Sequence, residues 1–317
     1  MRINIMNTIG EIFRFTDFGE SHGVAVGGVI DGVPSRMVID EEAIRHDLDR
    51  RAGRIGESGI PDSGEGLAVS ERAKEEKDEV EWLSGVISGQ QSGASEHSGK
   101  FNSQLVTLGT PVAFIIRNTN ARPEDYEALK DVYREGHADK VYEQKYGIRD
   151  YRGGGRASAR ETVARVVAGS IAKQILAQDG IRVEGHLVQV GDETDPTKFK
   201  ALLESVKAAG ESVGGVVECR VTGVPAGVGE PIFDKLQARL AYAIMSINGC
   251  RTYEQVSGIV GGISDGNDIV FRCRFKATAT KMREYGGRHD VCIAVRAVPV
   301  VEAMTSMTIL DVKLLSR

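Results

Sequence analysis

The sequence of residues 152–176 is RGGGRASARETVARVVAGSIAKQIL, which joins a triple-glycine loop to an amphipathic segment. Within this segment, apolar residues recur along one stripe, at Val163, Val167, Ile171 and Ile175. This spacing predicts a helix over residues 161–176 with one buried face. A buried helix needs other elements to cover it, so the rest of the chain must supply a core around it.

The start of this helix carries the pattern of an anion site. Ser158 followed by Glu161 matches a capping box, which predicts that the helix begins at Ser158 with its free backbone N–H groups facing the glycine loop. Arg156 and Arg160 lie four residues apart, and Arg152 stands just upstream. The alternative is a capped helix whose arginines pair with surface carboxylates. Three arginines around a glycine run favour phosphate or carboxylate binding.

Other segments predict a mixed fold. Alternation predicts strands over residues 9–15, 26–31 and 216–221, and periodicity predicts helices beginning near Asp40 and over 231–247. We find no repeat and no linker, so we expect one domain over residues 1–317, of the α/β or α+β class. The polar stretches 53–80 and 88–104 are predicted as surface loops or insertions, and the charge run 71–79 as a solvated face.

Composition excludes several classes of protein. The 317 residues are 41% hydrophobic and 27% charged, which is typical of a globular chain. The formal net charge of −5 gives no global attraction to nucleic acid or to an anionic membrane. No run reaches the roughly 18 apolar residues of a membrane span. Four widely spaced cysteines without a CxxC pair predict neither a metal site nor disulfides, and favour the cytoplasm.

Three histidine-bearing motifs are candidates for chemistry. GESHG at 19–23 matches the GxSxG elbow of serine hydrolases, with Ser21 as nucleophile, but only one predicted strand precedes it. His22 in this motif is as readily structural as catalytic. His137 is either a general acid or a loop histidine bonded to Asp139. GGRHD at 286–290 ends on Asp290, and its alternative is a turn with a surface ion pair.

Motifs for large or nucleotide ligands are absent from the sequence. It contains no GxxxxGK[ST] phosphate loop, no GxGxxG after a strand, no HExxH and no basic patch interleaved with aromatic residues. The remaining candidate is an arginine-rich, histidine-bearing site for a small polyanion.

Eight collinear segments resemble chorismate synthase. They cover most of the chain and are residues 8–23, 46–51, 136–139, 146–156, 223–227, 245–248, 261–264 and 287–290. The resemblance implies an α+β fold with a helical layer between antiparallel sheets, and a homotetramer. It also implies elimination of phosphate from 5-enolpyruvylshikimate 3-phosphate with reduced FMN as cofactor, and leaves open whether NADPH reduces the flavin.

The same resemblance implies roles for individual residues. His22 matches the proton donor to the departing phosphate, His137 the histidine near the flavin, and Asp290 the acceptor of a flavin proton. The flavin contacts it implies are Arg156, Ala157, Ser158, Asn248, Gly249, Gly261, Lys276, Thr278, Thr280 and Arg288. The substrate contacts it implies are Arg51, Arg54, Arg134 and Arg160.

Two departures from the family pattern keep an alternative open. Arg51 is followed by AGRIGE at 52–57 instead of the family's Pro-Gly-Gln-Ser-like turn, so Arg54 is the candidate for the second substrate arginine. The family's long loop before the Gly261 motif is missing, since few residues separate it from Asn248. A degenerate homologue that binds FMN or polyanions without catalysis is therefore the second hypothesis.

Overall fold

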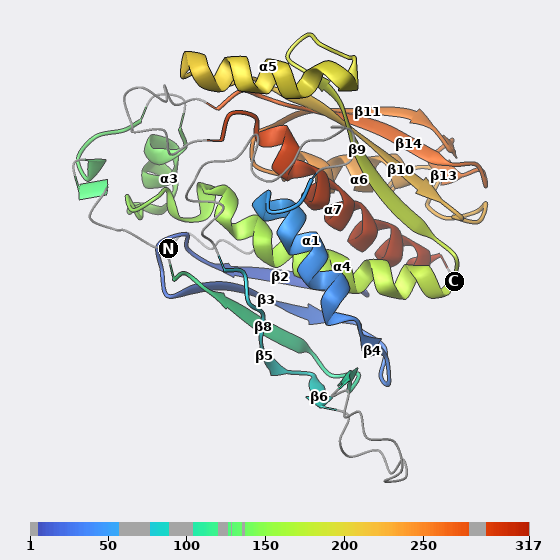
Figure 1. Ribbon diagram of the computed structural model, residues 1–317. Helices are drawn as coiled ribbons and strands as arrows, with labels where there is room; N and C mark the ends of the chain where they lie inside the picture. The colour runs from blue at the N-terminus through green and yellow to red at the C-terminus, as the bar shows by residue number, and fades with distance from the viewer. Residues whose placement is uncertain are drawn as a thin grey trace, which may run out of the picture.

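Two antiparallel sheets enclose a layer of helices in the computed structural model (Figure 1). The structure describes residues 6–56, 77–88, 104–119, 126–127, 129–134, 137–278 and 290–316. One sheet has five strands in the order β1-β2-β3-β8-β5, and the other has four in the order β11-β14-β10-β9. Helices α1, α4, α6 and α7 lie between them (Figure 1). The expected α+β sandwich is confirmed.

The elements have the following bounds. The strands are β1 (Thr8–Ile9), β2 (Arg14–Gly19), β3 (Ala25–Asp31), β4 (Val38–Ile39), β5 (Glu81–Ser84), β6 (Val86–Ser88), β7 (Leu105–Thr107), β8 (Val112–Arg117), β9 (Arg182–Val190), β10 (Gly215–Thr222), β11 (Cys250–Ser257), β12 (Ile259–Val260), β13 (Ile263–Ser264) and β14 (Ile269–Phe275). The helices are α1 (Glu41–Ala52), α3 (Asp139–Tyr146), α4 (Thr162–Gln178), α5 (Pro196–Ala209), α6 (Leu236–Met245) and α7 (Ile293–Leu315), with 3-10 turns at Gly155–Ala157 and Ala159–Glu161.

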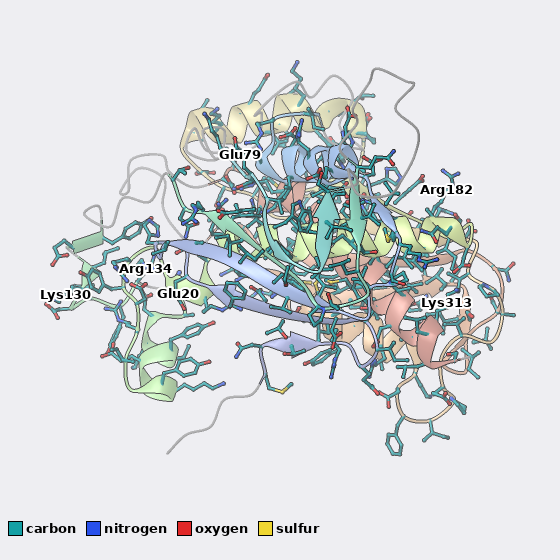
Figure 2. All side chains as sticks on the ribbon, turned by 90° about the horizontal axis from the view of Figure 1, so that it is seen from below. Glu20, Glu79, Lys130, Arg134, Arg182 and Lys313 are labelled. Carbon is teal, nitrogen blue, oxygen red and sulfur yellow. The ribbon has the colours of Figure 1, made fainter. Side chains whose placement is uncertain are left out.

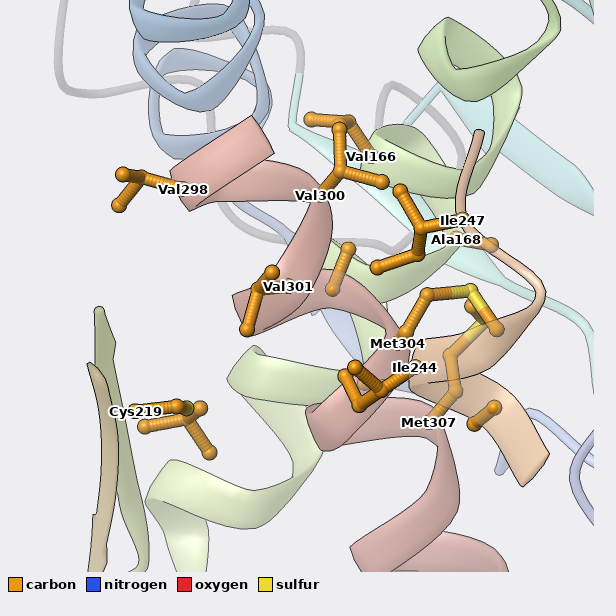
Figure 3. Close-up of a cluster of buried hydrophobic side chains, with 14 of the residues drawn as sticks. Val166, Ala168, Cys219, Ile244, Ile247, Val298, Val300, Val301, Met304 and Met307 are labelled. Carbon is orange, nitrogen blue, oxygen red and sulfur yellow. The ribbon is translucent and has the colours of Figure 1, made fainter. Parts of the chain in front are cut away.

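Helix α7 forms the centre of the core. It packs against α4, α6, β9 and β10, and Met304 and Met307 lie among apolar side chains from α4 and α6 (Figure 3). Its mean hydropathy of 1.5 over an 18-residue window matches that of a membrane span, but 89% of this window is buried inside the fold. It is therefore a core helix, since its apolar surface is already covered by protein.

A buried ionic cluster holds three helices together. Glu302 on α7 accepts from Arg50 on α1, from the Nζ of Lys173 on α4 at 2.5 Å and from the backbone N–H of Gly185 on β9 at 2.8 Å. The Lys173 ammonium also contacts Asp47 at 3.0 Å. Burial would raise the pKa of Glu302, but Lys173 and Arg50 outweigh it and lower the pKa to about 2. The cluster fixes α1, α4, α7 and β9 relative to one another.

Two predicted elements differ from the structure. The strand over 9–15 is interrupted between β1 and β2, because the backbone N–H groups of Glu11, Ile12 and Phe13 turn to donate to the carboxylate of Asp311 on α7. Helix α6 begins at Leu236 instead of residue 231, since the backbone N–H of Leu236 donates to the carbonyl of Gly262. Both differences arise from partners distant in sequence.

One residue of the predicted polar loops is buried. Most of 53–80 and 88–104 lies outside the described residues, so the prediction of loops or insertions is not tested there. Asp78, however, has a fully buried side chain that contacts Arg160 and Arg51. The charge run 71–79 is therefore not a solvated face at this position. A carboxylate that meets two guanidinium groups can be buried because they compensate its charge.

Candidate active site

The triple-glycine loop lies directly against His22 and His137. Gly153 has φ +63°, and a Cβ there would stand 2.0 Å from His22 Nδ1. Gly154 has φ +86°, and its Cβ would stand 2.8 Å from His137 Cε1. Any side chain at either position would collide with an imidazole, so glycine allows the loop to contact both rings. The structure thus brings together two predicted site residues from distant segments.

His22 is held in the turn between β2 and β3. It is 6% exposed, its Nδ1 lies 3.1 Å from Ser21 Oγ, and Tyr126 meets its ring edge-on at 4.7 Å between centroids. The nucleophile elbow of a hydrolase needs a strand, the serine and then a helix. Here Ser21 lies between two antiparallel strands. The serine hydrolase hypothesis has no support from this geometry.

His137 belongs to a small charged group at the start of α3. Its Nδ1 lies 2.8 Å from Asp139 Oδ1, and Asp139 also accepts from Arg134 Nε at 2.9 Å. Burial and the Arg134 guanidinium lower the pKa of His137, while Asp139 acts in the opposite direction. Burial would raise the pKa of Asp139, but its hydrogen bonds from Arg134 hold it below the ordinary value. At neutral pH the ring is neutral beside an ionised carboxylate.

Arg160 is fixed from several sides. Its Nη1 donates to Asp78 at 2.5 Å, and its Nε donates to Asn118 Oδ1 at 3.0 Å. Arg51 donates to Thr162 Oγ1 at 2.9 Å and to a backbone carbonyl, and its side chain is 2% exposed. Burial would raise the pKa of Asp78, but Arg160 and Arg51 outweigh it and lower the pKa. Two predicted substrate arginines therefore share one carboxylate.

The other two arginines of the loop point elsewhere. Arg156 Nη1 donates to Asp17 on β2 at 3.0 Å, and Arg152 Nε donates to Asp150 at 2.8 Å with a side chain that is 43% exposed. Arg152, Arg156 and Arg160 thus each pair with a different carboxylate, and joint binding of an anion by the three stays a prediction.

The capping-box prediction is half confirmed. Ser158 Oγ accepts from the backbone N–H of Arg160 at 3.3 Å, so it caps the 3-10 turn that leads into α4. Glu161 does not reach back to Ser158. Its carboxylate accepts from Arg165 at 2.9 Å and lies hydrogen-bonded to Asp17. Burial and Asp17 raise the pKa of Glu161 to about 8 against the effect of Arg165. Glu161 therefore holds a proton up to a higher pH than an ordinary carboxyl group does.

Several predicted flavin contacts are adjacent. Asn248 Nδ2 donates to the carbonyl of Ala157 at 3.0 Å, and the backbone N–H of Lys276 donates to the carbonyl of Gly249 at 3.0 Å. The Oδ1 of Asn248 is buried and accepts no hydrogen bond from the described residues. A buried acceptor without a donor is costly, so this atom is suited to a ligand N–H or O–H group.

Gly261 is not brought to this group. It lies in the turn between β12 and β13, which contacts the 229–236 loop at the far end of the molecule from α3 (Figure 1). The reason is strand β11, whose 8 residues at roughly 3.3 Å each carry the chain about 26 Å away from Gly249. Within one copy of the described chain, the Gly261 contact is therefore not supported.

Asp290 is oriented by an arginine that the sequence analysis missed. Arg296 on α7 donates from Nη1 to Asp290 Oδ2 at 2.9 Å and from Nε to the carbonyl of Arg51 at 2.8 Å. Thr278 Oγ1 donates to the carbonyl of Asp290 at 2.9 Å. These bonds place Asp290 beside the segment that carries the substrate arginines. The predicted contacts Thr280 and Arg288 lie outside the described residues.

The remaining predicted contact is tied locally. Arg54 Nε donates to Asp49 at 2.7 Å, and its charge helps to lower the pKa of Asp78. That Arg54 replaces the family's second substrate arginine stays a prediction.

Four residues of the site were missed in the sequence analysis, because none of them lies in a motif. Each is identified only by a partner distant in sequence, and they are Asn118, Asp78, Asp17 and Arg296. No group of metal-binding side chains occurs among the described residues.

A pocket of about 490 Å³ opens beside the glycine loop, which contributes Gly154, Gly155 and Arg156 to its lining. It lies between β2 and α3, with Phe18, Tyr142 and Tyr146 on its apolar side and Asp17 and Arg156 on its polar side. Glu20 and Arg134 lie at this same end of the molecule, away from Arg182 and Lys313 (Figure 2). The candidate site and the pocket thus have residues of the glycine loop and Asp139 in common.

Comparison with known proteins identifies the family. The family model described as "Chorismate synthase" matches residues 13–258 and 251–314. The chain belongs to the chorismate synthase family. The chorismate synthase of Azobacteroides pseudotrichonymphae is 39% identical over 96% of this chain and 98% of its own length. That of Christiangramia forsetii is also 39% identical, over 96% of each chain.

A solved structure agrees with the fold. The crystal structure titled "Crystal Structure of Chorismate Synthase" superposes with a TM-score of 0.69 at 26% identity, covering 96% of this chain and 92% of the other. As a chorismate synthase, the chain is a carbon–oxygen lyase that acts on a phosphate ester, in the shikimate pathway of aromatic amino acid biosynthesis. Nothing in these comparisons favours the degenerate homologue.

The comparisons also locate a difference between this chorismate synthase and its relatives. The alignment with the Azobacteroides enzyme runs over 376 positions, more than the 317 residues of this chain, so this chain has gaps relative to it. The two family matches overlap at residues 251–258, which form most of β11. The family pattern is therefore interrupted between Asn248 and Gly261, where the sequence analysis noted the missing loop.

Proposed function

We propose that elimination takes place where the glycine loop meets His22 and His137, with reduced FMN bound beside Asn248. The observation that carries this proposal is the double contact of Gly153 and Gly154 with the two imidazoles. It joins two histidines that lie 115 positions apart in the sequence to the arginine-bearing start of α4. A loop without side chains lets a ligand approach both rings closely.

Arginines on both sides of the loop would bind the anionic groups of 5-enolpyruvylshikimate 3-phosphate. Arg134 and Arg160 have side chains that are 14% and 9% exposed, so each presents little charge to water. A guanidinium already fixed by carboxylates binds an anion with little loss of side-chain freedom. Arg51 is more deeply buried and acts in the proposal mainly through its contact with Asp78.

His22 is the proposed donor of a proton to the departing phosphate. Its Nδ1 is engaged near Ser21, which fixes the ring in the turn. His137 is proposed to face the cofactor as a neutral ring, because its pKa is lowered and Asp139 accepts from Nδ1. Its Nε2 then remains an acceptor on the side of Gly154.

Asp290 is the proposed proton acceptor of the site. Arg296 donates to one oxygen of its carboxylate, which fixes the orientation of the side chain. Because a carboxylate is planar, the hydrogen bond to one oxygen also fixes the position of the other oxygen. Arg296 also donates to the Arg51 carbonyl, so the acceptor and the substrate arginines move as one unit.

The residues present fit reduced FMN. The buried Asn248 Oδ1 needs a donor, and an isoalloxazine ring carries N–H groups. In the proposal Ala157, Asn248, Gly249 and Lys276 hold the cofactor. When bound beside these residues, reduced FMN would supply transient electron donation to an elimination without net redox change. NADPH is the candidate reductant.

Self-assembly into a homotetramer is part of the proposal. The outer face of the five-stranded sheet has no covering element in the described chain (Figure 1). It presents Phe18, Val29, Ala113 and Ile115, which are half-buried or exposed. The same face also carries the Arg14–Asp31 and Arg117–Glu81 ion pairs, and a mixed face of this kind suits a second copy of the same chain. We place the enzyme in the cytoplasm, which the four buried free cysteines support.

Anaerobic turnover tests the proposal. The enzyme should form chorismate from the phosphate ester when FMN is reduced by dithionite, and a parallel reaction with NADPH and FMN tests the reductant. Asp290→Asn should abolish most turnover and leave FMN bound, while Asp268→Asn, at an exposed ion pair with Arg220, should not. FMN binding without any chorismate in the wild type would indicate the degenerate homologue.

A further inference from the structure

Asn118 makes three side-chain hydrogen bonds immediately after β8. Its Nδ2 donates to the carbonyls of Glu20 and Gly23, both at 2.9 Å. Its Oδ1 accepts from Arg160 Nε at 3.0 Å. Both amide N–H groups and the amide oxygen are therefore used. No sequence motif assigns this residue a role in the site.

These bonds connect two parts of the proposed site. The carbonyls of Glu20 and Gly23 are the two ends of the turn that carries His22, and the backbone N–H of Gly23 closes that turn onto Glu20 at 3.0 Å. The Arg160 guanidinium is held on its other side by Asp78. Asn118 thus stands between the turn of the proposed acid and a proposed substrate arginine.

We propose that Asn118 is a positioning residue that sets the placement of His22 relative to Arg160. The inference rests on the proposed function, because it assigns His22 to the leaving phosphate and Arg160 to a substrate anion. A substrate held by Arg160 presents its phosphate to His22 only if the two groups keep a fixed separation. A displacement of about 1 Å in such a constellation can cost about 100-fold in rate.

The amide is suited to this task for a chemical reason. Two carbonyls need donors and the guanidinium needs an acceptor, and a side-chain amide offers both in one planar group. A carboxylate would lose both donors. A hydroxyl would retain one donor at most. The hydrogen bonds at this position, and not only the volume of the side chain, therefore favour Asn.

A double-mutant cycle between Asn118→Leu and Arg160→Lys tests the inference. Asn118→Leu keeps the approximate volume and removes all three bonds, and Arg160→Lys keeps the charge and removes the Nε donor. We expect kcat/KM to fall about 100-fold in Asn118→Leu, and the double variant to be less than about 3-fold worse than that variant. Asn118→Ser, with one donor, should lie between Asn118→Leu and the wild type.

Other outcomes overturn the inference. A kcat/KM within about 2-fold of the wild type in Asn118→Leu, or losses that multiply in the double variant, would show that Asn118 does not couple the two groups. If Asn118→Leu shows no thermal unfolding transition, the cycle is run with Asn118→Ser under the same criterion. Asn267→Leu, on an exposed turn, is the matched control and should retain full activity.

The proposed function and this inference fail differently. If the wild type forms no chorismate with reduced FMN, both the proposed function and the inference are contradicted. If the wild type is active and Asn118→Leu is equally active, only the inference is contradicted. FMN affinity, measured by flavin fluorescence, should be within about 2-fold of the wild type in all Asn118 variants, because the amide contacts no residue of the proposed flavin group.

Discussion

His22 occupies the space that a side chain at residue 153 would need, with its Nδ1 2.0 Å from the position of a Cβ there. The contact joins the β2–β3 turn to the loop before α4, two segments that the sequence separates by more than a hundred residues. The placement of the proposed acid is therefore set by the absence of a side chain.

Gly153→Ala should remove most activity. The added methyl group must push His22 out of its place, and we expect a loss of about 100-fold in kcat. Gly180→Ala is the matched control, since Gly180 also has positive φ (+76°) but has nothing within 4 Å of its Cβ position. Both variants carry a similar backbone cost of about 1 kcal/mol. Equal turnover in the two variants would contradict the assigned role of His22.

Asn248→Leu should weaken FMN binding. The substitution removes the buried Oδ1 acceptor and the hydrogen bond to the Ala157 carbonyl. We expect the Kd for reduced FMN to rise about 10-fold, which corresponds to the loss of one hydrogen bond of about 1.4 kcal/mol. Flavin fluorescence under anaerobic conditions measures it. An unchanged Kd would place the cofactor elsewhere, and the pocket beside Tyr142 would become the next candidate.

Glu161→Gln should flatten the dependence of stability on pH. The pKa of Glu161 is raised to about 8 in the folded state from an ordinary 4.5, so the folded protein binds the extra proton between these values. Stability from this group is then complete below pH 4.5 and falls as the pH rises toward 8. The glutamine mimics the protonated acid.

Thermal unfolding between pH 5 and 9 checks this prediction. The Tm of the wild type should fall relative to that of the Glu161→Gln variant as the pH rises, with the largest difference above pH 8. Glu254→Gln, at an exposed position of β11, is the control. A constant difference in Tm across the range would show that the pKa of Glu161 is not raised in the folded state.

Lys173→Met should destabilise the fold strongly. It leaves the carboxylate of Glu302 buried with less compensation, and breaking a buried pair in this way costs about 3 to 5 kcal/mol. Lys198→Met is the control, because Lys198 is 64% exposed and pairs with carboxylates at the surface. Urea unfolding at pH 7 measures the difference. Similar unfolding midpoints for the two variants would contradict a stabilising role of the cluster.

The same cluster predicts acid sensitivity. The pKa of Glu302 is lowered to about 2 in the folded state from an ordinary 4.5. Its contribution is present above pH 4.5 and is lost as the pH falls toward 2. In Glu302→Gln this part of the acid-induced loss of stability should disappear, although the variant is less stable at pH 7. Urea midpoints at pH 3 and pH 7 provide the measurement.

Helix caps and apolar spacing in the sequence correctly predicted the helices and strands that such local signals determine. Helix α1 begins after Asp40, which caps it, and strand β3 and helix α4 lie where the apolar spacing placed them. The break between β1 and β2 had no such signal, because it depends on Asp311 at the other end of the chain. The burial of Asp78 within the charge run 71–79 could likewise not be predicted, because it depends on partners distant in sequence.

The site was predicted in part for the same reason. The glycine loop and the histidine motifs identified the residues that meet, and the family resemblance gave Asp290 its role. The directions of the arginines could not be read from their spacing, because each depends on a carboxylate contributed by another segment, as Asp17 is for Arg156. The residues that orient others, such as Asn118 and Arg296, carry no motif of their own.

The position of α7 has a consequence for how the protein is made. It is the last described element in chain order, yet it lies innermost in the sandwich. On a translating ribosome, every other described element emerges before the helix around which they pack. Until α7 emerges, the apolar faces that pack on it lack their central partner. Transiently exposed apolar surface of this kind makes a folding chain prone to aggregation.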